Sequence, residues 1–162
     1  MPRNPKYPLE SLREHRDRKV EDATAQLGDA VRVREAADDA KRRAEQERVE
    51  AEVRAAAVRE DEAHRLANGE LCVADLARAQ AWEHAASAQM ADLSKAIERA
   101  DGQLGLARER EAAVRTELGQ KKADLDVVEK DEARFDAGVR RARDASEEEA
   151  AEEAFAARRR QG

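Results

Sequence analysis

The side chains that could perform chemistry are few and scattered. The histidines are His15, His64 and His84, and the single cysteine is Cys72. A zinc site formed by His64 and Cys72 is conceivable, but no second Cys/His pair completes the tetrahedron. The segment 102–105, Gly-Gln-Leu-Gly, lacks the spacing and the following Lys-Ser/Thr of a phosphate-binding loop. We therefore expect no catalytic residue, no metal and no cofactor, and we interpret the chain as a non-enzyme.

The composition argues against a compact globular domain. Charged residues make up 42% of the 162 residues and aromatic residues 2%, while Ala dominates the hydrophobic fraction and contributes little apolar area. The 31 basic and 37 acidic residues are interspersed, so no basic stripe predicts nucleic-acid binding. No apolar run is long enough to span a membrane, no secretory signal opens the chain, and a lone cysteine is typical of a reducing compartment. We expect a cytoplasmic protein that does not insert into membranes.

Helix signals divide the chain into two long helices. Pro8 suits the first turn of a helix, and no Pro follows it. Asn68-Gly69 is a strong stop signal because both residues tolerate the left-handed conformation, and Asp75 is expected to be the N-cap of the second helix. The predicted fold is all-α, with an extended arm over 1–8, a helix over 9–67, a turn over 68–75, a helix over 76–158 and a tail over 145–162 that frays.

The second helix carries a long apolar seam. Steps of four and three from Ala79 to Ala142 pass through nineteen positions in one register, and sixteen of them are apolar. This repeat predicts a left-handed supercoil against a partner helix. The seam of the first helix, from Val20 to Val58, is weaker because Arg34, Lys41 and Arg48 interrupt it. A second apolar line on that helix comprises Val49, Val53, Ala56 and Ala63.

We predict an antiparallel coiled-coil hairpin with a C-terminal helical overhang. Folding back at about residue 71 places Leu9 near residue 133 and leaves the chain beyond about 136 uncovered. Trp82 is expected to lock the turn end of the hairpin, and the alternative is an anchor for a partner. A basic cluster at the other end is either a solvated face or a docking tip for an acidic partner. Its members are Arg13, Arg16, Arg18, Lys19, Arg140, Arg141 and Arg143.

The opening segment 7–23, from Tyr-Pro-Leu-Glu-Ser-Leu-Arg to Lys-Val-Glu-Asp-Ala, resembles the start of the type III secretion central-stalk family. Its members include the flagellar export protein FliJ and the injectisome protein YscO. The start of the second helix, Ala74-Asp75-Leu76 followed by Trp82, is also similar to that family. So is the plan of two long helices around one break, so the resemblance covers nearly the full chain.

The resemblance implies a stalk that couples a hexameric export ATPase to the cytoplasmic ring of an export-gate protein, at the cytoplasmic face of a bacterial export apparatus. Few aromatic residues lie near 50–64, which favours the injectisome branch over the flagellar one. Some members of the family also bind chaperones of exported proteins. The implied ATPase contacts are Leu9, Leu12, Arg13, Arg16, Val20, Phe135 and Arg140. The implied export-gate contacts are Val53, Ala57, Glu60, Trp82 and Ala86.

Two other classes of function stay open at this point. The hairpin predicts a monomer in isolation. The weaker seam of the first helix instead favours a generic coiled-coil scaffold or dimerisation rod with no motor partner. An amphipathic helix that binds membranes or nucleic acid is the third class, and binding that weakens steeply with salt would identify it.

Overall fold

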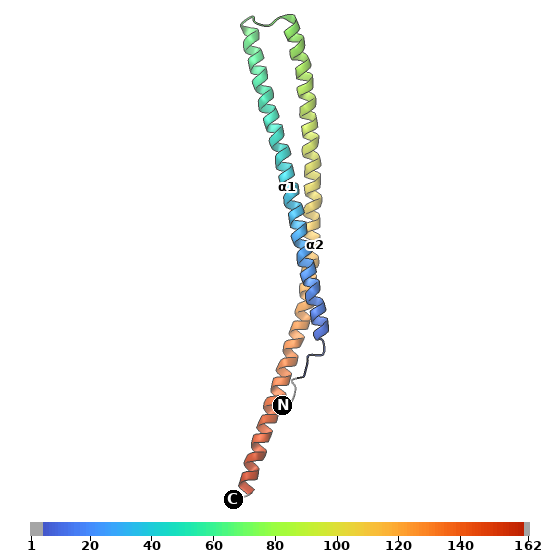
Figure 1. Ribbon diagram of the computed structural model, residues 1–162, viewed down its shortest axis with the longest axis vertical. Helices are drawn as coiled ribbons and strands as arrows, with labels where there is room; N and C mark the ends of the chain where they lie inside the picture. The colour runs from blue at the N-terminus through green and yellow to red at the C-terminus, as the bar shows by residue number, and fades with distance from the viewer. Residues whose placement is uncertain (1–4, 161–162) are drawn as a thin grey trace. The chain divides into compact units, whose positions relative to one another are not determined.

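The computed structural model describes residues 5–160 and contains two long helices that pack against each other (Figure 1). Helix α1 comprises Glu10–Ala67 and helix α2 comprises Val73–Arg160, and no strand occurs between residues 5 and 160. This confirms the predicted all-α hairpin. No helix in the described residues is long and apolar enough to cross a membrane.

The chain divides into two compact units, and both helices contribute to each. The terminal unit combines residues 1–27 with 114–162, and the turn unit comprises residues 28–113. In the terminal unit, α2 stays helical to Arg160, whereas we expected the tail past residue 145 to fray. All of its side chains from 140 to 160 are exposed, and Arg143 pairs with Glu147 one turn later at 2.9 Å. Such pairs and the many Ala residues favour the helix without tertiary contacts.

The turn unit contains the connection between the helices, where Gly69 ends α1. Its φ of 71° lies in the left-handed region that favours glycine. The Gly69 N–H donates to the Leu66 carbonyl at 3.1 Å and the Glu70 N–H donates to the Arg65 carbonyl at 2.9 Å. These two bonds form a Schellman motif, which satisfies the last carbonyls of the helix. The Asn-Gly pair therefore acts as the stop signal that the sequence predicts.

Helix α2 begins three residues earlier than predicted because Asp75 acts from inside the helix. The Asp75 carboxylate accepts from the Cys72 backbone N–H at 3.0 Å, and the Asp75 N–H donates to the Cys72 carbonyl at 3.0 Å. The carboxylate bond is one half of a capping box, in which Cys72 holds the N-cap position and Asp75 the third position of the helix, whereas the Asp75 N–H bonds to the Cys72 backbone and not to its side chain. The prediction of Asp75 as the N-cap is therefore wrong. The bond to Cys72 keeps the pKa of Asp75 below its usual value.

The seam of α2 is the face that packs on α1. Every predicted seam position from Ala79 to Val139 is buried or half-buried, and only Ala142 is exposed. Leu104, in the turn unit, is the most enclosed large side chain at 1% exposure. The seam of α1 contributes mainly small residues to the packing. Its fully buried members are Ala23, Ala30, Ala51 and Ala55.

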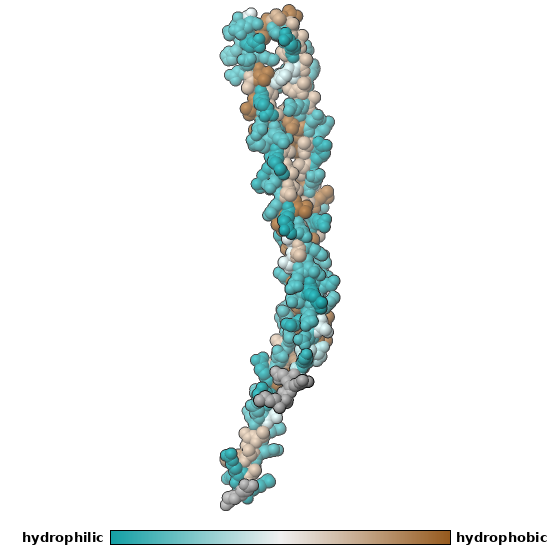
Figure 2. Space-filling model, viewed as in Figure 1, coloured by the Kyte–Doolittle hydropathy of each residue, from teal (hydrophilic) through white to brown (hydrophobic). Residues whose placement is uncertain are grey.

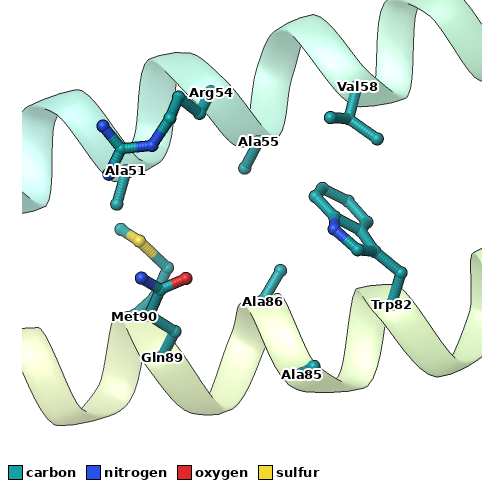
Figure 3. Close-up of a pocket in the computed structure, with 9 residues that line it drawn as sticks. All are labelled: Ala51, Arg54, Ala55, Val58, Trp82, Ala85, Ala86, Gln89 and Met90. Carbon is teal, nitrogen blue, oxygen red and sulfur yellow. The ribbon is translucent and has the colours of Figure 1, made fainter.

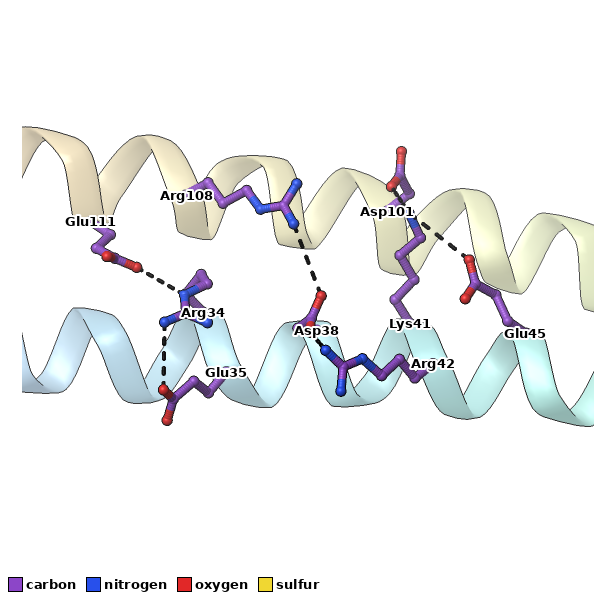
Figure 4. Close-up of polar contacts among 9 residues, drawn as sticks. All are labelled: Arg34, Glu35, Asp38, Lys41, Arg42, Glu45, Asp101, Arg108 and Glu111. Atoms are coloured by element: carbon purple, nitrogen blue, oxygen red, sulfur yellow. Dashed lines mark hydrogen bonds and ion pairs between the residues drawn. The ribbon is translucent and has the colours of Figure 1, made fainter.

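Two of the three cations that interrupt the α1 seam in the turn unit pair with carboxylates of α2 (Figure 4). Arg34 donates to the buried Glu111 at 2.9 Å, and Lys41 donates to Asp101 at 2.6 Å. The bond to Lys41, followed by its charge, holds the pKa of Asp101 below its usual value. Arg34 and Lys41 therefore belong to the interface between the helices, whereas Arg48 is exposed.

The enclosure of Leu104 gives a stability prediction for the turn unit. Leu104→Ala removes a side chain that is 1% exposed, and we expect it to lower the free energy of unfolding by about 2–5 kcal/mol. Leu106→Ala is the matched control, because Leu106 is 69% exposed two residues along the same helix and should change stability by less than about 0.5 kcal/mol. Urea unfolding followed by circular dichroism measures both. Equal losses would contradict the described packing.

Candidate interaction surfaces

Tyr7, which lies just before α1, packs against α2 in the terminal unit. Its hydroxyl donates to the Asp131 carboxylate at 2.7 Å and lies 3.4 Å from the Val128 carbonyl. Its ring packs on Phe135 with a centroid separation of 5.6 Å and a tilt of 57°. This arrangement buries the apolar body of the tyrosine and satisfies its polar tip. Burial and the bond to Asp131 raise the pKa of Tyr7 to about 12.

Two of the predicted ATPase contacts, Arg13 and Arg16, point to α2 in the terminal unit. The Arg13 Nε lies 3.5 Å from the Glu132 carboxylate, and an Arg16 N–H donates to the Asp124 carbonyl. We expected the basic residues 140–143 beside this part of α1, whereas Arg13 and Arg16 contact Glu132 and the Asp124 backbone. Glu132 beside Arg13 and Asp131 beside Tyr7 add negative charge to this part of the terminal unit, and the docking tip for an acidic partner stays a prediction.

The other predicted ATPase contacts also belong to the terminal unit. Leu9 and Arg140 are exposed, whereas Leu12, Val20 and Phe135 are half-buried. The exposed apolar side chain of Leu9 lies two residues after Tyr7, which contacts α2. Among the predicted ATPase contacts, Leu9 is therefore the one whose side chain is apolar, exposed and close to a residue that packs on α2.

In the turn unit, a gap of about 320 Å³ separates the helices beside Trp82 (Figure 3). Trp82 points toward Val58, and small alanines line much of the remaining wall. The sequence explains the gap, because the α2 seam steps by four residues twice in succession, from Trp82 to Ala86 to Met90. Two such steps depart from the 3.5 repeat and locally unwind a supercoil. The expectation of one unbroken register is therefore wrong at this point. The lining residues are Ala51, Arg54, Ala55, Val58, Trp82, Ala85, Ala86, Gln89 and Met90.

The predicted export-gate contacts do not share one surface of the turn unit. Ala86 is 8% exposed and Trp82 is half-buried, and both face α1 across the gap. Val53 is 64% exposed, and Ala57 and Glu60 are also exposed. Helix geometry places the second apolar line, which includes Val49 and Val53, on the face of α1 away from Ala51 and Ala55. The turn unit thus offers an outward apolar face and a separate interhelical gap.

Further apolar side chains are exposed around the turn, where Figure 2 shows them in brown. Leu66, Val73 and Leu76 are the large ones. Cys72 is exposed between them, and its thiol donates to Asp75 at 2.9 Å. Within residues 5–160, no three His, Cys, Asp or Glu side chains group in a way that could hold a metal ion.

Tyr7 is the only tyrosine, so its ionisation can be followed directly by absorbance. We expect it to titrate near pH 12 in the folded protein and near 10 in urea. Because the folded pKa is the higher one, neutral Tyr7 stabilises the fold below pH 10, and this contribution disappears as pH rises through about 12.

Asp131→Asn is the control for this titration. It removes the charged acceptor but keeps the burial, which is the larger cause of the shift, so the pKa of Tyr7 should fall only part of the way toward 10. A native titration indistinguishable from that in urea would show that the arm does not pack on α2.

The gap predicts that a larger side chain is tolerated at one buried alanine and not at another. Ala55 and Ala107 are both 6% exposed, but only Ala55 lines the gap. Ala55→Leu should raise the free energy of unfolding by about 0.5–2 kcal/mol, because it fills empty space. Ala107→Leu should lower it by about 1–3 kcal/mol through overpacking. Urea unfolding checks both, and similar losses for the two variants would contradict the gap.

Comparison with known proteins finds no match: no family model matches the chain, and no curated protein or solved structure is significantly similar to it. Function must therefore be argued from the surfaces above and from the resemblance of the opening segment.

Proposed function

We propose that this chain is a non-enzymatic stalk of a bacterial type III secretion export apparatus, which couples a hexameric export ATPase to the export gate. The observation that carries the proposal is the anchored arm of the terminal unit. Tyr7 fastens the resembling segment to α2 beside Phe135, and six of the seven implied ATPase contacts lie within residues 9–20 or at Phe135. A preformed contact surface of this kind loses little conformational entropy on binding.

The fold supports the same proposal. A stalk that enters a ring must be narrow, and two helices with an alanine-lined seam can approach closely. The exposed helical segment 140–160 supplies a further surface for a partner, with Phe155 as its large apolar side chain. We also propose that the chain lies at the cytoplasmic face of the export apparatus. There it contacts the export gate and secretion chaperones.

A coiled-coil scaffold without a motor partner is the second candidate function. The outward apolar face of α1 in the turn unit favours it, because Val49 and Val53 are exposed in a helical pattern. Scaffolding through this face predicts self-association that Val53→Glu abolishes. Light scattering of the two proteins separates it from the stalk, which is a monomer in isolation.

Stimulation of the partner enzyme tests the stalk proposal. The export ATPase of the same bacterium is mixed with the full chain, and its rate of ATP hydrolysis is measured. We expect binding and stimulation by the wild type. Leu9→Glu should reduce the apparent affinity by about tenfold, because it places a charge at an apolar contact.

Leu106→Glu serves as the matched control, since it makes the same change at an exposed leucine of the turn unit. It should retain the wild-type affinity. If the wild-type chain neither binds nor stimulates the ATPase, the stalk proposal is wrong.

A further inference from the structure

A hollow of about 200 Å³ lies between the helices in the terminal unit, and basic side chains form most of its wall. We call it the basic hollow. Arg16 lies on α1 about one turn before Val20, where the seam of that helix begins, and Lys121 lies on the seam of α2, so both helices bring a cation to the hollow. The lining residues are His15, Arg16, Lys19, Lys121 and Asp124.

The charged residues at the basic hollow differ from the charged residues elsewhere between α1 and α2. In the turn unit, the seam cations Arg34 and Lys41 each meet a carboxylate of the opposite helix. Within residues 5–160, Arg16 donates to the neutral Asp124 carbonyl, and Lys121 forms an ion pair with Glu117 of its own helix at 3.7 Å. Arg16 and Lys121 are cations that line the same hollow and repel each other, and Asp124 is the carboxylate among its lining residues.

The remaining lining groups add unused donors. Neither His15 nor Lys19 forms an ion pair within residues 5–160, and the Asp124 carboxylate forms none there either. Arg16 uses one N–H for the Asp124 carbonyl, which leaves most of its five donors available. The hollow therefore presents donors of three kinds, from guanidinium, ammonium and imidazole groups.

We propose that the basic hollow binds a small phosphate-bearing anion. A phosphate group has tetrahedrally arranged oxygens that accept charge-assisted hydrogen bonds from several directions at once, as these donors offer. A volume of about 200 Å³ accommodates such a group together with bridging waters of about 30 Å³ each. Basic side chains outnumber Asp124 in the lining, so a bound anion offsets their repulsion and stabilises the hairpin.

The experiment is a titration of the full chain with inorganic phosphate at constant ionic strength, with chloride as the balancing anion, and a parallel titration with ADP. Amide chemical shifts report the position of binding. We expect saturable shifts confined to residues near 15–19 and 121–124, with affinity in the millimolar range for the single phosphate group. Tighter binding of ADP would identify a nucleotide as the source of the phosphate, and equal binding would identify the free ion.

Lys19→Gln should weaken phosphate binding by about fivefold, because it removes one charge-assisted donor. Lys122→Gln is the matched control, since Lys122 is an exposed lysine adjacent to Lys121 that does not line the hollow. It should bind phosphate as the wild type does. Equal weakening in both variants, or shifts spread along the whole chain, would show a general salt effect and overturn the proposal.

Lys121→Met separates binding from misfolding. It removes one of the facing cations, so its melting temperature in chloride should be higher than that of the wild type, and added phosphate should raise it less. A lower melting temperature together with an unchanged response to phosphate would overturn the proposal. So would binding to phosphatidylcholine vesicles containing phosphatidic acid without any binding of free phosphate or ADP, because that result would assign the hollow to a membrane surface.

Discussion

Pairing of opposite charges across an alanine-lined seam is the constraint that aligns α1 with α2. Alanine layers bury little area, so packing alone discriminates weakly between one alignment and another. Arg34 and Glu111 add that discrimination in the turn unit. A slip of one heptad would bring Arg34 to Leu104 or Leu118 instead, and a cation packed on leucine loses its partner and its water. Charge pairs such as that of Arg34 with the buried Glu111 thus specify the register, as polar residues in the seam do in other coiled coils.

The turn favours the same alignment by independent means. The Schellman motif at Gly69 ends α1 at Ala67, and the bonds between Cys72 and Asp75 begin α2 at Val73. A connection this short leaves few ways to start the antiparallel pairing. Local turn chemistry and the charge pairs therefore agree, and such agreement between levels is what gives a sequence one preferred structure.

The repeating apolar positions along the helices could be predicted from the sequence. The contacts of single residues that follow no repeat could not. The α2 seam was visible because the large apolar residues from Trp82 to Val139 recur at a helical spacing. Arg34 was interpreted as an interruption because an apolar pattern carries no information on which carboxylate lies opposite. Tyr7 was missed as an anchor because one aromatic residue between prolines has no period. Asp75 was misplaced because a carboxylate can cap from either the N-cap or the third position.

The candidate surfaces differ in what a partner would have to displace. To reach Ala86, a partner must separate α1 from α2 beside the gap, and it would lose the packing of Trp82 toward Val58. To reach Leu9 it displaces only water, because the side chain is exposed next to an arm that Tyr7 already holds in place. Binding free energy is what remains after such costs are subtracted. The terminal unit is therefore the better primary docking surface. Contact at Trp82 fits a partner that binds a locally opened hairpin, and the two successive four-residue steps of the seam make opening easiest at that place.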